Sequence, residues 1–276
     1  MTASAYHVLS TLALACYLAA ALWLISSMRQ AALATIGGRR MAGLCLSVAA
    51  VSVHAFVLWQ GVSAKPEFAL SIAETASLVG FGVAVIAVVA CMRQARFAGA
   101  SAILLAIAGL VAVTTNEGSR EFTVAQQGWE LNIHIALSVL AYSLITVGTG
   151  LAIALTLLDR RLRHRQPLGW FSILPSVATL ESGMFNALGG GFLALSLGLF
   201  SGFFFIDDIF AQSLSRKVIL SCAAWITLGA LLFGRWRFGW RGRMARNWTL
   251  GGYVLLVLAY FGSKLVLENV LGRHWG

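Results

Sequence analysis

Charged side chains are scarce in this sequence, at 11% of 276 residues, whereas 59% of the residues are hydrophobic. Soluble domains carry roughly a quarter charged residues, so a soluble core cannot absorb this much apolar surface. Long polar stretches are also missing, which excludes a separate soluble domain. We therefore expect one integral membrane domain over residues 1–276, with an all-α, polytopic helix bundle as its fold class.

Cysteine and proline are few as well. The four cysteines form no CxxC pair, and each lies in an apolar run, so neither a disulfide framework nor a zinc ribbon is indicated. The three prolines fall between the apolar runs, and the broken helices of a transporter are therefore the least favoured interpretation. The sequence also lacks the GxSxG, HExxH, P-loop and dinucleotide fingerprints, so no motif indicates an enzyme.

Long apolar runs are what the sequence has instead. About twenty apolar residues cross roughly 30 Å of hydrocarbon in a helix, and this criterion predicts about eight transmembrane helices. The first run is expected to be a retained helix rather than a signal peptide, because no Lys or Arg precedes it. The predicted spans are 6–28, 41–63, 72–92, 99–115, 131–158, 185–206, 217–234 and 248–271.

The basic residues indicate topology. The net charge is +10, and most Lys and Arg residues follow the odd-numbered spans, whereas the other connections hold most of the acidic residues. By the positive-inside rule, the Arg-rich connections face the cytoplasm, and an even number of spans places both termini outside. Short Arg clusters directly at helix ends disfavour a nucleic-acid interface.

Membrane lipids are the partners expected for the connection after the seventh span. There the aromatic residues Trp236, Phe238 and Trp240 alternate with Arg235, Arg237 and Arg241, a pattern that suits an anchor at the lipid headgroups. The connection 159–184 is expected to lie along the membrane surface as a broken amphipathic element.

Two histidines inside the predicted spans are the main candidates for a functional role. His54 lies about 10 Å below the outer membrane edge and His134 about 5 Å below it, estimated at 1.5 Å per residue. Two imidazoles at a similar depth can supply both axial ligands of a haem iron. The competing interpretation is that each histidine only hydrogen-bonds within the bundle.

Other residues near the outer side extend this candidate site. Tyr142 shares the helical face of His134, and Trp225 lies about 10 Å from the outer end of its span. Arg216 and Lys217 could pair with carboxylates such as haem propionates, or be ordinary helix-end charges. Lys264 could do the same, or be neutralised by Glu268 four residues later.

Several segments resemble a known family. They are Gly239-Trp240-Arg241-Gly242-Arg243, Tyr260-Phe261-Gly262-Ser263-Lys264, Val53-His54-Ala55, Asn132-Ile133-His134 and Leu174-Pro175. The sequence is similar to the cytochrome c assembly membrane proteins, the CcsA- and CcmC-like group, and especially to the YpjD/HemX branch. The resemblance implies an all-helical haem-binding fold, with His54 and His134 matching the membrane histidines of the family. The tryptophan-rich outer motif of the family's haem lyases is absent, as is the histidine that many relatives carry before Lys217, so a single membrane haem site is implied.

The leading hypothesis is a haem-binding protein of the bacterial inner membrane that acts in haem handling or cytochrome c maturation. Both termini would lie in the periplasm, and a b-type haem would be held by His54 and His134. Haem-maturation proteins or other membrane proteins would be its partners. The alternative is a haem-free structural or regulatory partner of another membrane protein.

Overall fold

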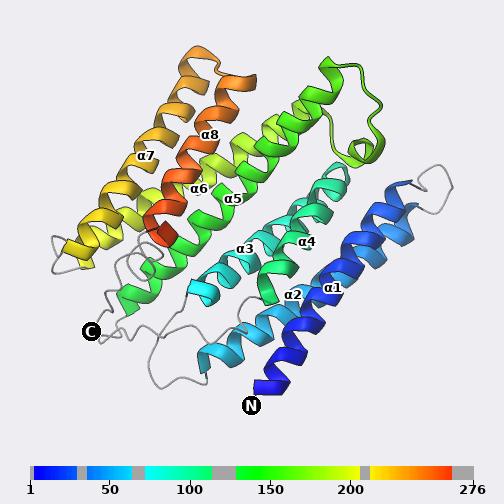
Figure 1. Ribbon diagram of the computed structural model, residues 1–276, viewed down its shortest axis with the longest axis horizontal. Helices are drawn as coiled ribbons and strands as arrows, with labels where there is room; N and C mark the ends of the chain where they lie inside the picture. The colour runs from blue at the N-terminus through cyan, green and yellow to red at the C-terminus, as the bar shows by residue number, and fades with distance from the viewer. Residues whose placement is uncertain (1–2, 30–35, 64–71, 114–128, 206–211, 263–276) are drawn as a thin grey trace. The chain divides into compact units, whose positions relative to one another are not determined.

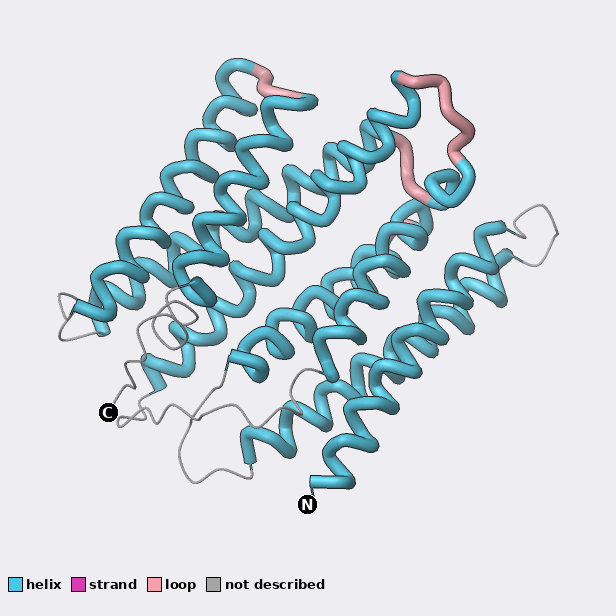
Figure 2. Tube along the Cα trace, viewed as in Figure 1, coloured by secondary structure: helices cyan, strands magenta, loops and turns pink. Residues whose placement is uncertain are grey.

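All regular elements in the described part of the chain are helices, as Figures 1 and 2 show. The computed structural model describes residues 3–29, 36–63, 72–113, 129–205 and 212–262. The all-α prediction is confirmed. The elements are α1 (Ala3–Arg29), α2 (Ile36–Ser63), α3 (Ile72–Arg93), η1 (Ala95–Phe97), α4 (Ala98–Val113), α5 (Trp129–Arg163), η3 (Gly169–Ile173), α6 (Val177–Phe205), α7 (Gln212–Phe238), α8 (Gly242–Val257) and the π turn η4 (Leu258–Gly262).

The helices have the length and composition of membrane spans. Seven helices within the described residues, α1 to α7, are long and apolar enough to cross a bilayer. Helix α8 is shorter, but together with its π turn it extends roughly 30 Å at 1.5 Å per residue. The described chain is thus a polytopic membrane bundle, in agreement with the predicted count of about eight.

The helices extend beyond the predicted spans at several ends. Helix α5 continues to Arg163, α6 begins at Val177 instead of residue 185, and α7 continues to Phe238. The predicted limits followed the apolar residues, but Arg, Glu and Ser continue a helix once it leaves the hydrocarbon. The hydroxyl of Ser176 accepts a hydrogen bond from the Thr179 amide at 3.4 Å, which caps the start of α6. The predicted surface element 159–184 is therefore mostly helix, with η3 between the two long helices.

The chain divides into two compact units, which we describe separately. The first contains α1 to α4 and the segment Leu157–Leu180. Helix α1 packs against α2 and α4, and α3 packs against α4 and α2, with these helices side by side in Figure 1. Close contact depends on small residues: a Cβ added to Gly109 of α4 would lie 2.9 Å from the Cβ of Tyr17 on α1.

The basic connections of the first unit gather at one of its ends. The Arg40 guanidinium, near the start of α2, donates hydrogen bonds to the carbonyls of Cys91 (2.6 Å) and Met92 (3.3 Å) at the end of α3. This contact satisfies carbonyls that a helix end leaves without partners. The turn η3 packs against α1 and α4. The start of α2, the end of α3, the start of α4 and the turn η3 therefore lie at one end of this unit.

The second unit contains residues 129–156 of α5, α6 from Glu181, and α7 with α8. Helices α7 and α8 lie side by side (Figure 1). A Cβ added to Gly252 of α8 would lie 2.8 Å from Leu228 of α7, so this pair also packs through a glycine. The core of the unit is apolar and is formed by Ile145, Leu188, Leu228, Leu231 and Leu256, all buried.

Candidate functional site

His54 lies in the core of the first unit, on α2, with an exposed fraction of 0%. Its Nδ1 is 3.2 Å from the hydroxyl of Tyr17 on α1, and its Nε2 is 2.9 Å from the hydroxyl of Ser77 on α3. The rings of Tyr17 and Phe81 approach the imidazole edge to face, with centroids 5.8 and 5.6 Å away. The residue therefore links three helices through a short hydrogen-bonded chain.

Both ring nitrogens of His54 are occupied in this arrangement. A neutral imidazole has one donor and one acceptor nitrogen, and two hydroxyl groups can satisfy both. An iron ligand needs a free lone pair on one nitrogen. The described arrangement of His54 therefore does not fit a haem ligand unless one of the two hydrogen bonds is given up.

His134 lies on α5 in the second unit and is half-buried. Its Nδ1 is 3.0 Å from the hydroxyl of Ser201 on α6, and Ser201 is 8% exposed. The same hydroxyl donates to the carbonyl of Gly198 at 2.8 Å. Among the described residues no side chain hydrogen-bonds to Nε2 of His134, and the Gly198 carbonyl also lies within hydrogen-bond reach of the ring. Metal-ligating histidines are typically held through one ring nitrogen in this way. The arrangement of His134 is therefore compatible with a haem ligand, and ligation stays a prediction.

The two histidines belong to different units. The structure does not bring them into one described cluster, and their joint ligation of one iron stays a prediction. Within the described residues no group of three or more His, Cys, Asp and Glu side chains could hold a metal ion. A haem needs at most two axial ligands from the protein, so its candidates are single histidines.

Tyr142 and Trp225 hold helices of the second unit together. The Tyr142 hydroxyl donates to the carbonyl of Leu256 on α8 at 2.8 Å, just before the π turn, and its ring contacts Tyr260. The Trp225 indole on α7 stacks on Phe192 of α6, with centroids 5.4 Å apart. Its Nε1 donates to Ser196 at 2.8 Å. Both side chains have packing roles, and a role toward a cofactor stays a prediction.

The remaining predicted site residues are cationic. Lys217 lies at the start of the apolar part of α7 and is half-buried. Arg216 is on the same helix, but its side chain is outside the described residues, as are Lys264 and Glu268. Their proposed pairing with carboxylates therefore stays a prediction.

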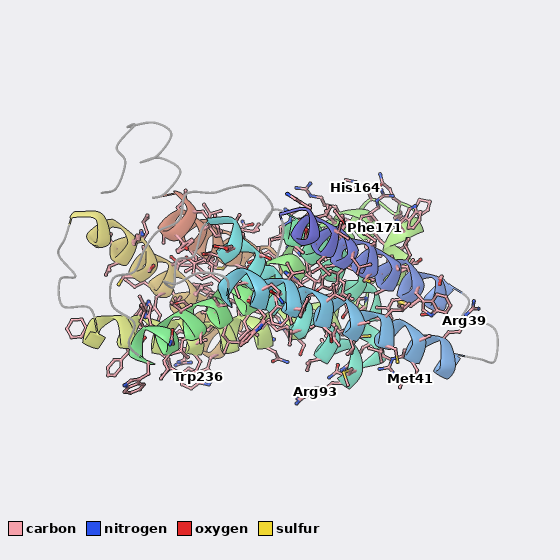
Figure 3. All side chains as sticks on the ribbon, turned by 90° about the horizontal axis from the view of Figure 1, so that it is seen from below. Arg39, Met41, Arg93, His164, Phe171 and Trp236 are labelled. Atoms are coloured by element: carbon pink, nitrogen blue, oxygen red, sulfur yellow. The ribbon has the colours of Figure 1, made fainter. Side chains whose placement is uncertain are left out.

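In the structure the residues of the predicted lipid anchor have two different environments. Arg235 approaches Glu181 of α6, with Nη1 3.9 Å from Oε1, and its guanidinium lies 4.6 Å from the centroid of Phe185. Arg241 also approaches Glu181, at 3.8 Å. Trp236, in contrast, is 81% exposed and points away from its helix in Figure 3. Arg235 thus fastens α7 to α6, and Trp236 faces the surroundings.

Sequence reasoning missed the partners that give each histidine its environment. Tyr17, Ser77 and Ser201 lie on other helices, 37, 23 and 67 residues away from the histidines they contact. Serine is common on the small-residue faces of membrane helices. No spacing along the chain distinguishes these three residues from the other serines and tyrosines.

The comparisons with known proteins agree with the resemblance seen in the sequence. The chain is similar to the inner membrane protein YpjD of Escherichia coli (strain K12), with 27% identity over 238 residues, 85% of this chain and 89% of the relative. It is similar to a 28.8 kDa protein of the nifR3-like 5′ region of Azospirillum brasilense, with 34% identity over 51% of this chain and 53% of the relative. It is also similar to the cytochrome c biogenesis protein CcsA of Prochlorococcus marinus (strain MIT 9303), with 24% identity over 59% of each chain.

No solved structure matches this chain. The family model described as cytochrome C assembly protein matches residues 10–271. That match covers nearly the whole sequence, including both membrane histidines. The chain therefore belongs to the cytochrome c assembly protein family.

Proposed function

We propose that this chain is a haem-binding protein of the bacterial inner membrane that acts in haem handling or cytochrome c maturation, with His134 as an iron ligand. The observation that carries the proposal is the one-sided hydrogen bonding of His134, which leaves Nε2 without a side-chain partner among the described residues. Family membership and the printed names of the YpjD and CcsA relatives support the location and the process.

The side chains of the second unit would bind and orient the cofactor. Nε2 of His134 offers its lone pair, while Ser201 holds the opposite side of the ring. An apolar helix bundle would suit the hydrophobic macrocycle of a haem. A bound haem would supply an iron centre that can be transferred with the macrocycle or change its oxidation state.

His54 is the sequence-based candidate for the second axial ligand of a b-type, bis-histidine haem. To take this role its ring must release Tyr17 or Ser77. A hydrogen bond between membrane helices contributes about 0.6–2 kcal/mol, which is the cost of releasing one. The release would change the contacts of α2 with α1 or α3.

The test is an optical titration of the detergent-purified protein with haem. The wild-type chain should give the oxidised and reduced bands of histidine-ligated haem, and His134→Ala should lose them. His164→Ala is the matched control, because His164 is exposed in the α5–α6 connection. Full occupancy with an unchanged spectrum in His134→Ala would contradict the proposal.

The His54→Ala variant separates two roles of that residue. A shifted spectrum would identify His54 as the second axial ligand. An unchanged spectrum together with a lower unfolding temperature would assign it to helix packing alone.

A haem-free structural or regulatory partner of another membrane protein is the second candidate function. The specific observation in its favour is that His54 has both ring nitrogens hydrogen-bonded within its unit. In this case wild-type protein would remain colourless when haem is supplied, and affinity purification from the membrane would recover a partner membrane protein.

A further inference from the structure

We infer that Ser201 is a positioning residue that sets the tautomer of His134 and so presents the Nε2 lone pair to a ligand metal. The inference rests on the proposed function and deepens it. Ser201 lies on α6 and contacts His134. Its role in this inference is to accept the hydrogen bond that keeps the imidazole proton on Nδ1.

The direction of the hydrogen bonds follows from the number of protons available. A serine hydroxyl carries one hydrogen, and that of Ser201 points to the carbonyl of Gly198, 2.8 Å away and three residues earlier. If the hydrogen pointed to His134 instead, two oxygen atoms would face each other at 2.8 Å without a proton between them. Toward His134 the hydroxyl therefore accepts, and the donor is Nδ1–H at 3.0 Å.

The tautomer then determines which nitrogen can bind a metal. A neutral imidazole with its proton on Nδ1 carries its lone pair on Nε2. Metal-ligating histidines typically donate the other ring N–H to a carboxylate, carbonyl or water, which orients the ring and raises its basicity. The Ser201 oxygen, itself polarised by donating to Gly198, takes that place here.

The packing of α5 against α6 keeps Ser201 in position. A Cβ added to Gly198 would lie 3.7 Å from the Ser138 hydroxyl and 3.9 Å from the Cβ of Leu137, so the two helices are in contact one turn below His134. Ser201 is 8% exposed, which leaves its hydroxyl little access to competing water.

His54 provides the internal comparison. It also contacts a serine on the following helix, Ser77, but Tyr17 occupies its other nitrogen. Tyrosine and serine hydroxyls can each donate or accept, so neither tautomer of His54 offers a free lone pair. The difference between the two histidines lies in their partners and not in the local sequence.

The first experiment measures the tautomer without haem. Protein with ¹⁵N-labelled histidine in detergent micelles should give an Nδ1–H signal pattern for His134, assigned by its loss in His134→Asn. Ser201→Ala should shift that signal toward the Nε2–H form or a mixture, and Ser201→Thr, which keeps the hydroxyl, should restore the wild-type pattern. Ser47→Ala is the matched control, because Ser47 is buried and bonds only to the Gly43 carbonyl.

The second experiment measures haem. Ser201→Ala should weaken haem binding about 10–100-fold, as loss of an outer hydrogen-bond partner does at other metal sites. If Ser201→Ala fails to fold by circular dichroism, Ser201→Cys replaces it, since a thiol is a weak acceptor of similar shape.

The two proposals fail in different ways. An unchanged His134 tautomer in folded Ser201→Ala or Ser201→Cys would overturn the inference whether or not haem binds. A wild-type protein that takes up no haem would overturn the proposed function, while the tautomer measurement would still report on Ser201.

Discussion

At the scale of single residues, the buried chain Tyr17–His54–Ser77 concentrates polar atoms where the surroundings are apolar. All three side chains are 0% exposed, and each lies on a different helix. A polar group buried in hydrocarbon without a partner is costly, so the three residues stabilise the same arrangement of α1, α2 and α3 together. Because the three residues depend on one another, removing one hydroxyl group tests whether these hydrogen bonds stabilise the packing of the helices.

Tyr17→Phe and Ser77→Ala should each lower the free energy of unfolding by about 0.6–2 kcal/mol, because each leaves one His54 nitrogen without its partner. The midpoint of denaturation in mixed micelles measures the change. Ser52→Ala is the control, since Ser52 is exposed on the same helix as His54. Equal stability of all three variants would show that the hydrogen bonds do not hold these helices.

The same two variants bear on haem binding. If His54 ligates iron after releasing a hydrogen bond, removal of Tyr17 or Ser77 hydroxyls should raise the fraction of six-coordinate haem. That result would assign His54 to the cofactor as well as to the packing.

At the scale of elements, α5 and α6 approach each other through one glycine of the Gly189-Gly190-Gly191 run. A Cβ added to Gly191 would lie 2.6 Å from a side-chain carbon of Ile145 and 3.1 Å from its backbone nitrogen. Nothing lies within 4 Å of a Cβ added to Gly189. Of the three glycines, Gly191 is therefore the one that closest packing of α5 against α6 requires.

Gly191→Ala should therefore destabilise the protein by about 1–3 kcal/mol, because the backbone of Ile145 cannot move aside without separating the helices. Gly189→Ala is the matched variant and should be neutral or stabilising by up to about 1 kcal/mol through helix propensity. Thermal unfolding followed by circular dichroism compares the two. A larger loss in Gly189→Ala than in Gly191→Ala would contradict the packing described for α5 and α6.

At the end of α7, contacts with a neighbouring helix give adjacent residues of one sequence pattern different roles. Arg235, Trp236 and Arg237 alternate in the sequence as an interfacial anchor would. In the structure Arg235 is 29% exposed at its side chain and faces Glu181, whereas Trp236 is almost fully exposed. Successive residues on a helix point about 100° apart, so one of them can pack inward while the next faces lipid.

At the scale of the whole molecule, topology is the property with the widest consequences. In the first unit the start of α2, the end of α3 and the segment after α5 lie at one end, and all carry arginines. The positive-inside rule predicts that this end faces the cytoplasm. His54, about two-thirds of the way along α2, would then lie in the periplasmic half of the bilayer.

Topology can be measured by labelling with a membrane-impermeant maleimide. Single cysteines at Arg96 and Arg163 should react only after the inner membrane is opened, and a cysteine at Gly276 should react in intact spheroplasts. The native cysteines of the described helices lie within membrane spans, where such a reagent does not reach them. Labelling of position 276 only after opening would place the C-terminus in the cytoplasm and refute an even number of spans.

The sequence by itself determined the helical class, the polytopic membrane character and the family. Each of these depends on sums along the chain: twenty apolar residues in a row have only a helix to satisfy their backbone in lipid. The topology prediction also follows from the sequence alone, because it depends only on which short connections carry Lys and Arg. His54 and His134 were identifiable because ionisable groups in such runs are rare.

Only the tertiary structure decided what surrounds those histidines. Both stand between apolar residues in the sequence, yet Tyr17 and Ser77 occupy both nitrogens of His54, while Ser201 is bound at Nδ1 of His134. These partners come from other helices, and the rotation of each helix about its axis determines which side chains meet. That rotation results from packing small residues against large ones across helices, such as Gly109 against Tyr17 and Gly191 against Ile145, and no single helix sequence contains it.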